Sequence, residues 1–381
     1  MSKDRSIIIY RDLLLQSSET FIRSQAEALK FHTPYYVGSK LLSGLSLPPA
    51  RTFLINKTEF LEGRLARLCS RTGRYSYQFV QQLRQLNPLL IHAHFGQDGA
   101  MALKLANNLA IPLIVTFHGY DITVKDKYVS FSTAQCLYLK RRAVLKREAN
   151  LFIAVSDFIK GKLIEQNFPS ERIVRHYIGI DTNLFQSDPC IQREPIVLFV
   201  GRLVEKKGCE YLIRAMLNVK IEFPEARLLI IGDGPLRVFL EDLAKKLSIN
   251  CQFLGGKTPE VVRYWMQRAK VFCVPSITAK SGDAEGFGLV FTEAQAMGLP
   301  VVSTVSGGIP EAVAHEETGF LVAERDVKAL SARITKLLED REVWQRCSQR
   351  GQERVRTQFN LSKQTHELEA IYKNFVAPVN K

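Results

Sequence analysis

The sequence predicts an α/β fold in which two doubly wound domains follow one another. Short apolar runs alternate with helical patterns along both halves of the chain, as in repeated β-α-β units. The runs are rich in Val, Ile and Leu without polar alternation, which favours parallel strands covered on both faces. A chain of 381 residues with 46% hydrophobic content also exceeds one ordinary core, so two domains are expected.

The first domain is predicted over residues 1–185. Its strands are expected at 6–10, 52–55, 89–95, 113–117 and 151–155. Its helices are expected at 19–30, 59–72, 75–86, 98–109, 134–148 and 156–166. The periodicity stops near Ile178, and a polar stretch with Pro189 and Pro195 follows, which places a linker at about 179–194.

The second domain is predicted over residues 186–360, where the same alternation restarts. Strands are expected at 196–200, 227–231, 251–254, 272–274 and 301–303. Helices are expected at 209–223, 236–247, 259–269, 289–297, 326–339 and 341–359. Open α/β sheets bind ligands at the carboxyl ends of their strands, so we expect the two domains to face a central cleft.

Charge and cysteine content indicate the compartment and the kind of partner. The formal net charge is +14, and residues 1–190 hold 25 Lys and Arg against 15 Asp and Glu. An anionic partner is therefore expected for the first domain, and without any nucleic-acid motif an anionic membrane surface is favoured over nucleic acid. The seven cysteines are scattered without a Cys-x-x-Cys pair, as in reduced cytoplasmic proteins.

Nothing in the sequence predicts a membrane span or a secretory signal. No window of 18 apolar residues exists, and the first apolar run is followed at once by charge, which is typical of a strand. Segment 60–74 instead predicts an amphipathic helix, with an apolar stripe beside Arg64, Arg67, Arg71 and Arg74. It either packs on its own sheet with its arginines in water or makes a peripheral contact at the inner membrane face.

The most informative stretch is 279–310, at whose centre Glu285 and Glu293 lie eight positions apart. Gly286 and Gly288 stand where a strand gives way to a helix, so backbone N–H groups and the positive helix end can face an anion. Carboxylates beside such a site are suited to accept hydrogen bonds from sugar hydroxyls. The alternative is that Glu293 only complements the helix dipole and that Glu285 is an exposed loop acid.

This stretch resembles the E-x7-E signature of retaining family-4 glycosyltransferases with the GT-B fold. The resemblance continues through Ser-Gly-Gly-Ile-Pro-Glu at 306–311 and Thr-Gly-Phe-Leu-Val at 318–322. It implies that Glu285 is catalytic and binds the hexose, while Glu293 binds the ribose of a nucleotide-sugar donor. It also implies a diphosphate site at the backbone of Phe287, Gly288 and Leu289, and a final helix, 361–381, that packs back onto the first domain.

A second donor-binding motif, Gly-Arg-Leu-x-x-x-Lys-Gly, ends the predicted strand 196–200. Arg202 and Lys207 flank its turn and can converge on a diphosphate, and the resemblance implies this role. The alternative is a solvated basic loop. Lys206 is predicted to face solvent in this way. The chain has no Asp-x-Asp metal motif, so fixed cations and helix dipoles are expected to stabilise the leaving group, without metal or other cofactor.

Three histidines in the first half lie within or directly after predicted strands: His92 and His94 within 89–95, and His118 after 113–117. His118 matches the family's cleft histidine, which implies a catalytic role near the donor sugar; the alternative is a hydrogen-bonded structural residue. His92 and His94 are spaced as a metal pair, but no carboxylate motif accompanies them, so no metal is expected. His94 is instead assigned to the acceptor pocket.

The segment after the first strand resembles a particular subgroup of the family. Ser-Glu-Thr-Phe at 18–21 replaces the Gly-Gly loop of many relatives and resembles the subgroup of exopolysaccharide and colanic-acid-type assembly. Ser18 and Glu19 are therefore assigned to the acceptor side, although Ser18 or Thr20 is also suited merely to cap a helix.

The resemblance implies transfer of a hexose from a nucleotide-diphospho-sugar to a glycan or lipid-linked acceptor, with retention and without metal. Two alternatives stay open: a GT-B nucleotide-sugar epimerase, and a non-catalytic nucleotide-sugar-binding subunit of a synthase complex. The presence of Glu285, Arg202 and Lys207 together argues against the non-catalytic subunit.

Overall fold

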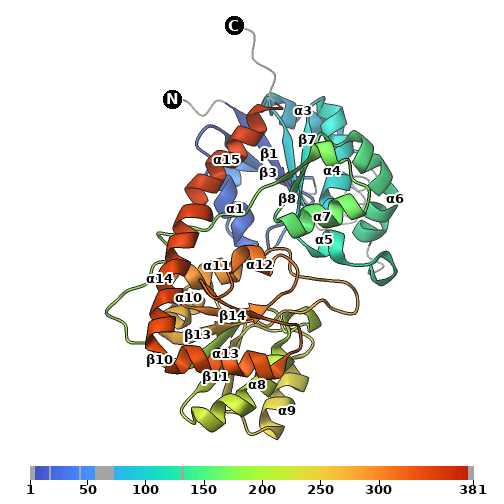
Figure 1. The fold of residues 1–381 in the computed structure, drawn as a ribbon. Helices are drawn as coiled ribbons and strands as arrows, with labels where there is room; N and C mark the ends of the chain where they lie inside the picture. The colour runs from blue at the N-terminus through green and yellow to red at the C-terminus, as the bar shows by residue number, and fades with distance from the viewer. Residues whose placement is uncertain (1–4, 17–18, 43, 56–72, 130–132, 376–381) are drawn as a thin grey trace. The chain divides into compact units, whose positions relative to one another are not determined.

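The computed structural model describes residues 5–16, 19–42, 44–55, 73–129 and 133–375. The chain divides into two compact units, Met1–Gly179 with Leu361–Lys381, and Ile180–Asn360 (Figure 1). The division comes at residue 179, against 185 in the prediction, because Ile180 is already part of the second unit. Its N–H donates to the Phe359 carbonyl at 2.8 Å, and it forms a parallel bridge with Asn360.

The first unit is built on a parallel sheet whose described strands have the order β5-β3-β1-β6-β7-β8-β9. The strands are β1 (Ser6–Tyr10), β3 (Thr33–Gly38), β5 (Thr52–Leu54), β6 (Ile91–His94), β7 (Leu113–Phe117), β8 (Leu151–Ala154) and β9 (Ile173–Arg175). A small parallel pair, β2 (Leu13–Leu14) and β4 (Lys40–Leu41), adjoins it. The strand order reverses between β1 and β6, so this sheet has its topological switch point there.

Helices cover both faces of this sheet. They are α1 (Thr20–Glu27), α3 (Tyr77–Gln85), α4 (Gly96–Leu109), α5 (Tyr120–Thr123), α6 (Thr133–Glu148), α7 (Asp157–Glu165) and α15 (Leu361–Lys373), with 3₁₀ turns η1 (Pro49–Arg51), η2 (Asp126–Tyr128) and η3 (Ser170–Arg172). α1 and α15 pack together on one face, and α4 packs on the other with α3 and α6 against it.

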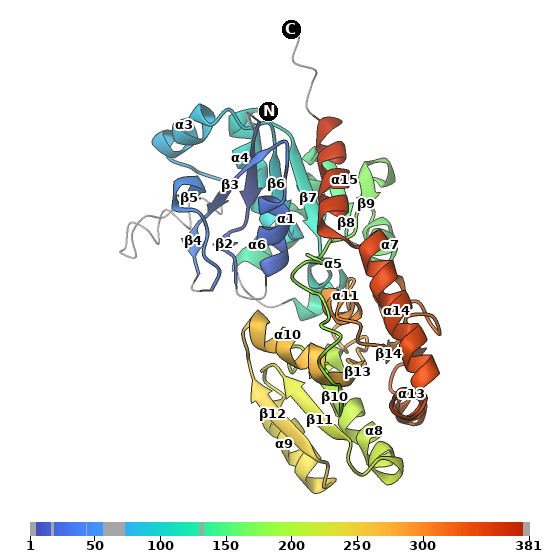
Figure 2. The ribbon, with the colours of Figure 1, turned by 90° about the vertical axis from the view of Figure 1, so that its left-hand side faces the viewer.

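The last helix belongs to the core of the first unit. Leu368 and Tyr372 of α15 are buried in one cluster with Ile7, Ile9 and Ile22 from the amino-terminal end of the chain. The Tyr372 hydroxyl lies 2.7 Å from Nδ1 of His92, and the Glu369 carboxylate accepts from the Phe31 N–H at 2.7 Å. Figures 1 and 2 both show α15 lying beside α1.

The second unit has a parallel sheet whose described strands have the order β12-β11-β10-β13-β14-β15. The strands are β10 (Glu194–Val200), β11 (Arg227–Ile231), β12 (Cys251–Gly255), β13 (Ala269–Cys273), β14 (Val301–Thr304) and β15 (Gly319–Val322). The order reverses between β10 and β13, which places the switch point of this sheet between the two strands that precede the predicted donor-binding motifs.

The helices of the second unit again lie on both faces. They are η4 (Glu205–Lys207), α8 (Cys209–Glu222), α9 (Arg237–Lys246), α10 (Pro259–Arg268), α11 (Leu289–Ala296), α12 (Ile309–Ala312), α13 (Val327–Glu339) and α14 (Arg341–Gln358). α13 packs against α8, and α14 packs against α11, so the two pairs cover different parts of the sheet (Figure 2).

The predicted elements that fall in the described residues form with shifts at their ends, and five described strands were not predicted: β2, β3, β4, β9 and β15. β3 was missed because Pro34 lacks an N–H, but β5 pairs only with Tyr36–Gly38, so Pro34 leaves no ladder bond unmade there. β2, β4, β9 and β15 are each only two to four residues long, too short to show a pattern. The predicted helix 59–72, with Arg64, Arg67 and Arg71, lies outside the described residues. Within the described part of the chain no helix combines the length and the apolar character needed to cross a membrane.

Candidate active site

In the second unit, the loops after β10 and β13 bring the predicted donor-binding residues together. Nζ of Lys207 lies 2.5 Å from Oε2 of Glu285, and both side chains are largely buried. These residues are 78 positions apart, and they meet because their loops leave adjacent strands at the same edge of the sheet. The switch point of this sheet therefore carries a carboxylate and a cation in direct contact.

A second ion pair lies beside the first and corrects the interpretation of Lys206. This lysine is buried, with 8% of its surface exposed, and its Nζ lies 2.9 Å from Oδ1 of Asp283. The Lys206 carbonyl also accepts from the Ile277 N–H at 2.7 Å. The prediction that Lys206 faces solvent was wrong because the partner that neutralises it lies 77 residues later in the chain.

The charge around Glu285 keeps it ionised although it is buried. Burial raises the pKa of the Glu285 carboxyl, but Lys207, Lys206 and Arg202 outweigh that effect and lower the pKa to about 2. Arg202 is itself exposed, and within the described residues no ion-pair partner is found for it. The site thus holds a permanent carboxylate beside a cation that a ligand can reach.

Backbone geometry at Gly288 and Gly307 fits the glycine-rich sequence. Gly288 precedes the first residue of α11 with a φ of +86°, a left-handed conformation that favours glycine. A Cβ on Gly307 would lie 2.2 Å from the Glu285 carbonyl oxygen, and that oxygen accepts from the Gly308 N–H at 2.9 Å. The loop after β14 therefore supports the loop that carries Glu285, with Phe287, Gly288 and Leu289 at the start of the helix.

Glu293 lies within the second turn of α11, and its environment differs from that of Glu285. Burial raises the pKa of the Glu293 carboxyl to about 7, and Arg263 on α10 opposes this only in part. The two carboxylates of the signature thus titrate far apart. Near neutral pH, Glu285 is ionised while Glu293 exchanges its proton.

Replacing Glu293 by Gln is expected to stabilise the protein at high pH. The folded carboxyl binds its proton more tightly than the unfolded one, whose pKa is near 4.5, so wild-type stability falls as pH rises from 4.5 to about 7. Glu293→Gln removes this loss and should raise the thermal midpoint at pH 8 by roughly 5 °C. The gain should shrink at pH 5. A control, Glu353→Gln on the exposed side of α14, should show no such dependence; equal behaviour of both variants would contradict the assignment.

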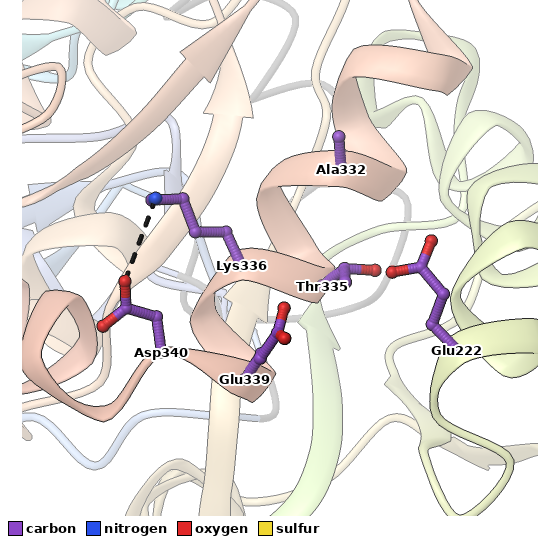
Figure 3. A pocket seen from close by; sticks show the side chains of 6 residues that line it. All are labelled: Glu222, Ala332, Thr335, Lys336, Glu339 and Asp340. Atoms are coloured by element: carbon purple, nitrogen blue, oxygen red, sulfur yellow. Dashed lines mark ion pairs between the residues drawn. The ribbon is translucent and has the colours of Figure 1, made fainter.

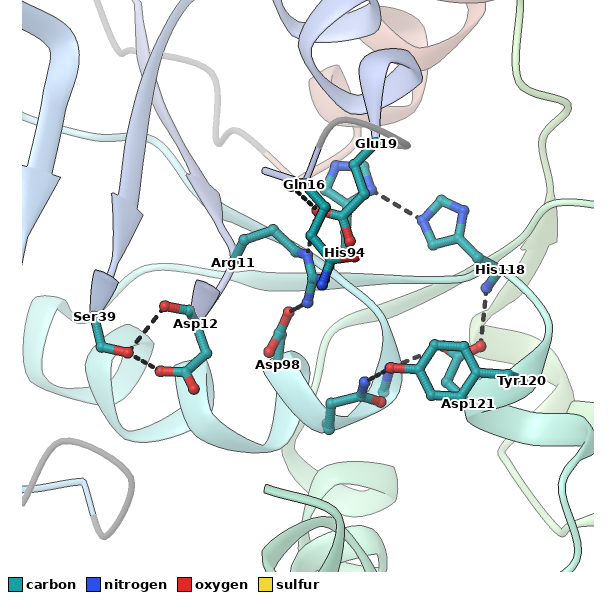
Figure 4. Close-up of polar contacts among 12 residues, drawn as sticks. Arg11, Asp12, Gln16, Glu19, Ser39, His94, Asp98, His118, Tyr120 and Asp121 are labelled. Carbon is teal, nitrogen blue, oxygen red and sulfur yellow. Dashed lines mark hydrogen bonds and ion pairs between the residues drawn. The ribbon is translucent and has the colours of Figure 1, made fainter. Parts of the chain in front are cut away.

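In the first unit, a buried cluster occupies the switch point between β1 and β6 (Figure 4). The Arg11 guanidinium forms ion pairs with Asp98 on α4 and with Glu19 at the start of α1. Its Cζ atom also lies 4.5 Å from the centroid of the Phe95 ring. Burial raises the pKa of Asp98 to about 7, although Arg11 lowers it. Asp98 and Arg11 were not identified from the sequence.

This cluster also contains Glu19. Its side chain is 9% exposed, and its second oxygen accepts from the Gln16 N–H at 3.1 Å, so the carboxylate is occupied by the protein itself. Glu19 was predicted to serve the acceptor side, and the structure places it as the partner of Arg11, holding the loop after β1. Ser18 lies outside the described residues.

Asp121 joins the loops that follow β6 and β7. Its carboxylate accepts from the backbone N–H groups of Gly96, Gly119 and His118 at 2.9, 2.9 and 3.1 Å. Burial raises its pKa to about 6, although these hydrogen bonds lower it. The carboxylate thereby fixes the backbone that carries His118.

His118 itself lies among aromatic rings. Ring centroids of Phe95 and Phe21 are 4.6 and 5.1 Å from that of His118, and its Nε2 lies 3.1 Å from Nδ1 of His94. Burial holds the pKa of His118 well below its ordinary value, and nearby Arg11 lowers it further. The imidazole is therefore neutral at physiological pH and able to hydrogen-bond as donor or acceptor.

The three histidines make contacts within the protein through their ring nitrogens. Both ring nitrogens of His92 already contact protein hydroxyls, Nδ1 with Tyr372 at 2.7 Å and Nε2 with Thr116 at 2.6 Å. His94 and His118 use a nitrogen each on one another. Over the described ranges, no group of three or more His, Cys, Asp or Glu side chains has the arrangement of a metal site.

A charged hollow in the second unit lies away from these residues. Glu222, Lys336, Glu339 and Asp340 line it at the last turns of α8 and α13, and Lys336 pairs with Asp340 at 3.9 Å (Figure 3). A helix that follows a parallel strand runs back along the sheet, so its last turn lies at the opposite edge from the loop of Glu285. This hollow therefore does not belong to the candidate site.

Comparisons with known proteins identify the family of the chain. Residues 44–184 match the model of Glycosyltransferase Family 4, and residues 181–354 match that of Glycosyl transferases group 1. The chain is 33% identical over 288 residues to WcaL of Salmonella typhimurium, named as a colanic acid biosynthesis glycosyltransferase; the match covers 73% of this chain and 69% of that protein. It is 30% identical over 273 residues to the amylovoran biosynthesis glycosyltransferase AmsK of Erwinia amylovora, covering 70% and 65%.

Solved structures share the fold. Anabaena HepE, in complex with UDP and glucose, superposes with a TM-score of 0.77 at 19% identity, over 97% of this chain and 100% of that one. A sucrose-phosphate synthase from Thermosynechococcus elongatus gives 0.76 at 23% identity, over 97% and 98%. With the sheets and signature described above, these matches show that the chain is a hexosyltransferase of glycosyltransferase family 4 with the GT-B fold, close to the enzymes of exopolysaccharide biosynthesis.

Proposed function

We propose that this protein transfers a hexose from a nucleotide-diphospho-sugar to a glycan or lipid-linked acceptor, with retention of configuration and without a metal ion. The contact between Lys207 and Glu285 at the start of α11 is the observation that carries this proposal. It sets a fixed cation and an ionised carboxylate side by side, the two charges that a diphosphate and a hexose require.

The charge of each residue determines which part of the donor it is proposed to bind. Lys207 and exposed Arg202, with the backbone of Phe287–Leu289 at the positive end of α11, bind the diphosphate and stabilise the charge that develops as the glycosidic bond breaks. Ionised Glu285 accepts hydrogen bonds from hexose hydroxyls, and Glu293 accepts those of the ribose.

The reaction needs no protein nucleophile. The acceptor hydroxyl attacks the anomeric carbon from the face that the diphosphate leaves, and its proton passes to an oxygen of the departing phosphate. His118 of the first unit is neutral and is held by the loop of Asp121, and its proposed role is to orient the hexose. Support for a nucleotide-sugar donor comes from the UDP and glucose in the HepE structure.

Donor binding tests the proposal directly. The thermal midpoints of the wild type and of the Arg202→Ala variant are each measured with UDP-, GDP- and ADP-sugars. A donor at 100 times its dissociation constant should stabilise the wild type by about 2.7 kcal/mol, and the variant much less. Hydrolysis or transfer products are then identified by mass spectrometry, and the anomeric configuration by NMR. Failure of every nucleotide sugar to shift the midpoint would refute the donor class, and an inverted product would refute retention.

Activity is expected to survive chelation. Lys207 and Arg202 supply positive charge at the diphosphate, so treatment with EDTA should leave the transfer rate within about twofold of the untreated enzyme. The measurement is the initial rate before and after dialysis against EDTA, with added Mn²⁺ and Mg²⁺ as controls. Loss of activity that either ion restores would contradict the metal-independent mechanism.

The acceptor partner is proposed from charge and from relatives. The positive first unit suits a lipid-linked acceptor at an anionic, inner membrane surface, with the enzyme cytoplasmic and peripheral. A phosphatidylinositol monomannoside mannosyltransferase of Mycobacterium tuberculosis is 32% identical over 238 residues, which cover 57% of this chain and 61% of that protein, and its name supports an acceptor of this class.

Charge reversal in the segment 60–74 should weaken membrane binding. Each basic residue near an anionic leaflet contributes about 1 kcal/mol, so replacing Arg67 and Arg71 with Glu should lower liposome affinity by well over tenfold. Cosedimentation with anionic and neutral liposomes is measured at low and high salt, and high salt should weaken the anionic case. Wild-type protein that stays in the supernatant throughout would favour a soluble acceptor.

A further inference from the structure

The imidazole of His118 has one nitrogen committed to the protein and one left over. Its Nε2 lies 3.1 Å from Nδ1 of His94, and the two rings are nearly parallel, with centroids 5.3 Å apart and an angle of 25°. Its Nδ1 is buried and has no hydrogen-bond partner in the described part of the chain. A buried polar atom without a partner is uncommon, and at a candidate active site it indicates a place for a ligand atom.

The contact between the two histidines couples their tautomers. Burial lowers the pKa of both imidazoles well below its ordinary value, so each ring is neutral and carries one N–H. A hydrogen bond between two neutral rings holds a single hydrogen. When His94 accepts at Nδ1, Nδ1 of His118 is a bare acceptor; when His94 donates, Nδ1 of His118 carries the hydrogen. His94 therefore decides which group His118 presents.

The orientation of the His94 ring is fixed by His92, which packs against it. It is 1% exposed, and its ring lies 4.4 Å from that of His92 on the same face of β6. His92 in turn is held between the Thr116 and Tyr372 hydroxyls at 2.6 and 2.7 Å. A buried ring held in this way is well placed to hold its neighbour.

We propose that His94 is a positioning residue: through its Nδ1 it fixes the tautomer and ring orientation of His118, and so leaves Nδ1 of His118 for a hydroxyl group of the sugar substrate. This rests on the proposed glycosyl transfer for the identity of the ligand, and on the geometry of the first unit for the coupling itself. His94 acts through His118 and does not touch the substrate.

Two substitutions separate the contact from the space that His94 fills. The amide of His94→Asn reaches the position of Nδ1 and keeps a hydrogen-bonding atom towards His118. The longer His94→Gln places its amide near the position of Nε2 instead and loses the contact. We expect the Gln variant to lower kcat roughly tenfold or more, as loss of a partner that orients a functional histidine does, with the donor KM within about threefold. The Asn variant should stay within about threefold of wild type.

Two further measurements distinguish positioning from a general structural effect. ¹⁵N spectra of histidine-labelled protein, assigned with His118→Ala, should show one tautomer for His118 in the wild type and the Asn variant, and a mixture or the other tautomer in the Gln variant. In the His118→Ala background, His94→Gln should have no further effect on kcat.

The outcomes are separable. An unchanged His118 tautomer in His94→Gln, or an equal loss of kcat with and without His118, would overturn the positioning role. If the wild type transfers no sugar at all, the proposed function fails, while the tautomer spectra still decide the coupling between His94 and His118.

Discussion

Glu285→Gln is expected to lower the rate of hexose transfer by roughly two orders of magnitude or more, because it removes an oriented charge from the transition state. The substitution keeps the shape of the side chain, but a neutral amide no longer balances Lys207, which lies 2.5 Å from the carboxylate. Initial rates at saturating donor measure the effect, and an unchanged thermal midpoint shows that the loop is still folded.

The matched control for this variant lies two residues away. Asp283→Asn removes the carboxylate that pairs with Lys206 in the same loop, and a loss of less than about tenfold is expected since Asp283 holds the loop rather than the hexose. Glu293→Gln should raise the apparent donor constant more than it lowers turnover. Equal small losses from all three variants would refute separate roles for the two carboxylates of the signature.

Arg11→Met is expected to destabilise the first unit by about 3–5 kcal/mol, the usual effect of removing one partner from a buried ion pair. Glu19 and Asp98 would remain buried without their shared cation, with side-chain exposures of 9% and 1%. The thermal midpoint should fall by about 10 °C, measured by circular dichroism.

Arg51→Met provides the comparison for Arg11. Arg51 pairs with Glu27 in the same unit, but the two side chains are 25% and 32% exposed, and such a pair contributes about 1 kcal/mol or less. If both variants lower the midpoint equally, the buried cluster has no special place in the stability of the unit.

The donor-binding residues of the second unit could be predicted from the sequence because each loop is short and carries a local pattern. Glu285, Gly288 and Glu293 lie within nine consecutive residues, and the preceding strand and following helix both show their hydrophobic periods. No local sequence pattern predicts the strand order that brings Lys207 to Glu285. Only the shared role of Lys207 and Glu285 at the donor was expected, from the resemblance to a family of known fold.

The first unit was less predictable because its contacts join distant residues. Arg11 and Asp98 are 87 positions apart, and a single Arg-Asp dipeptide after an apolar strand is an ordinary surface pattern. The one available signal was position: charges directly after β1, at the carboxyl end of a central strand, lie where ligands of such sheets bind. The partner of Glu19 was equally hidden in the sequence, because Arg11 reaches its carboxylate only once the loop after β1 has folded.

The position of α15 has a consequence for how the protein is made. The ribosome synthesises residues 1–179 before the whole second unit, and it synthesises α15 only after both. Until then, the apolar surface formed by Ile7 of β1 and Ile22 of α1 lacks Leu368 and Tyr372, and His92 lacks the hydroxyl that it contacts. The nascent amino-terminal unit therefore waits with an open apolar surface while about 180 further residues are translated, a delay on the order of ten seconds or more. The first part of the protein to be synthesised is thus the last to be completed, and a chaperone that shields this surface during translation would raise the yield of folded enzyme.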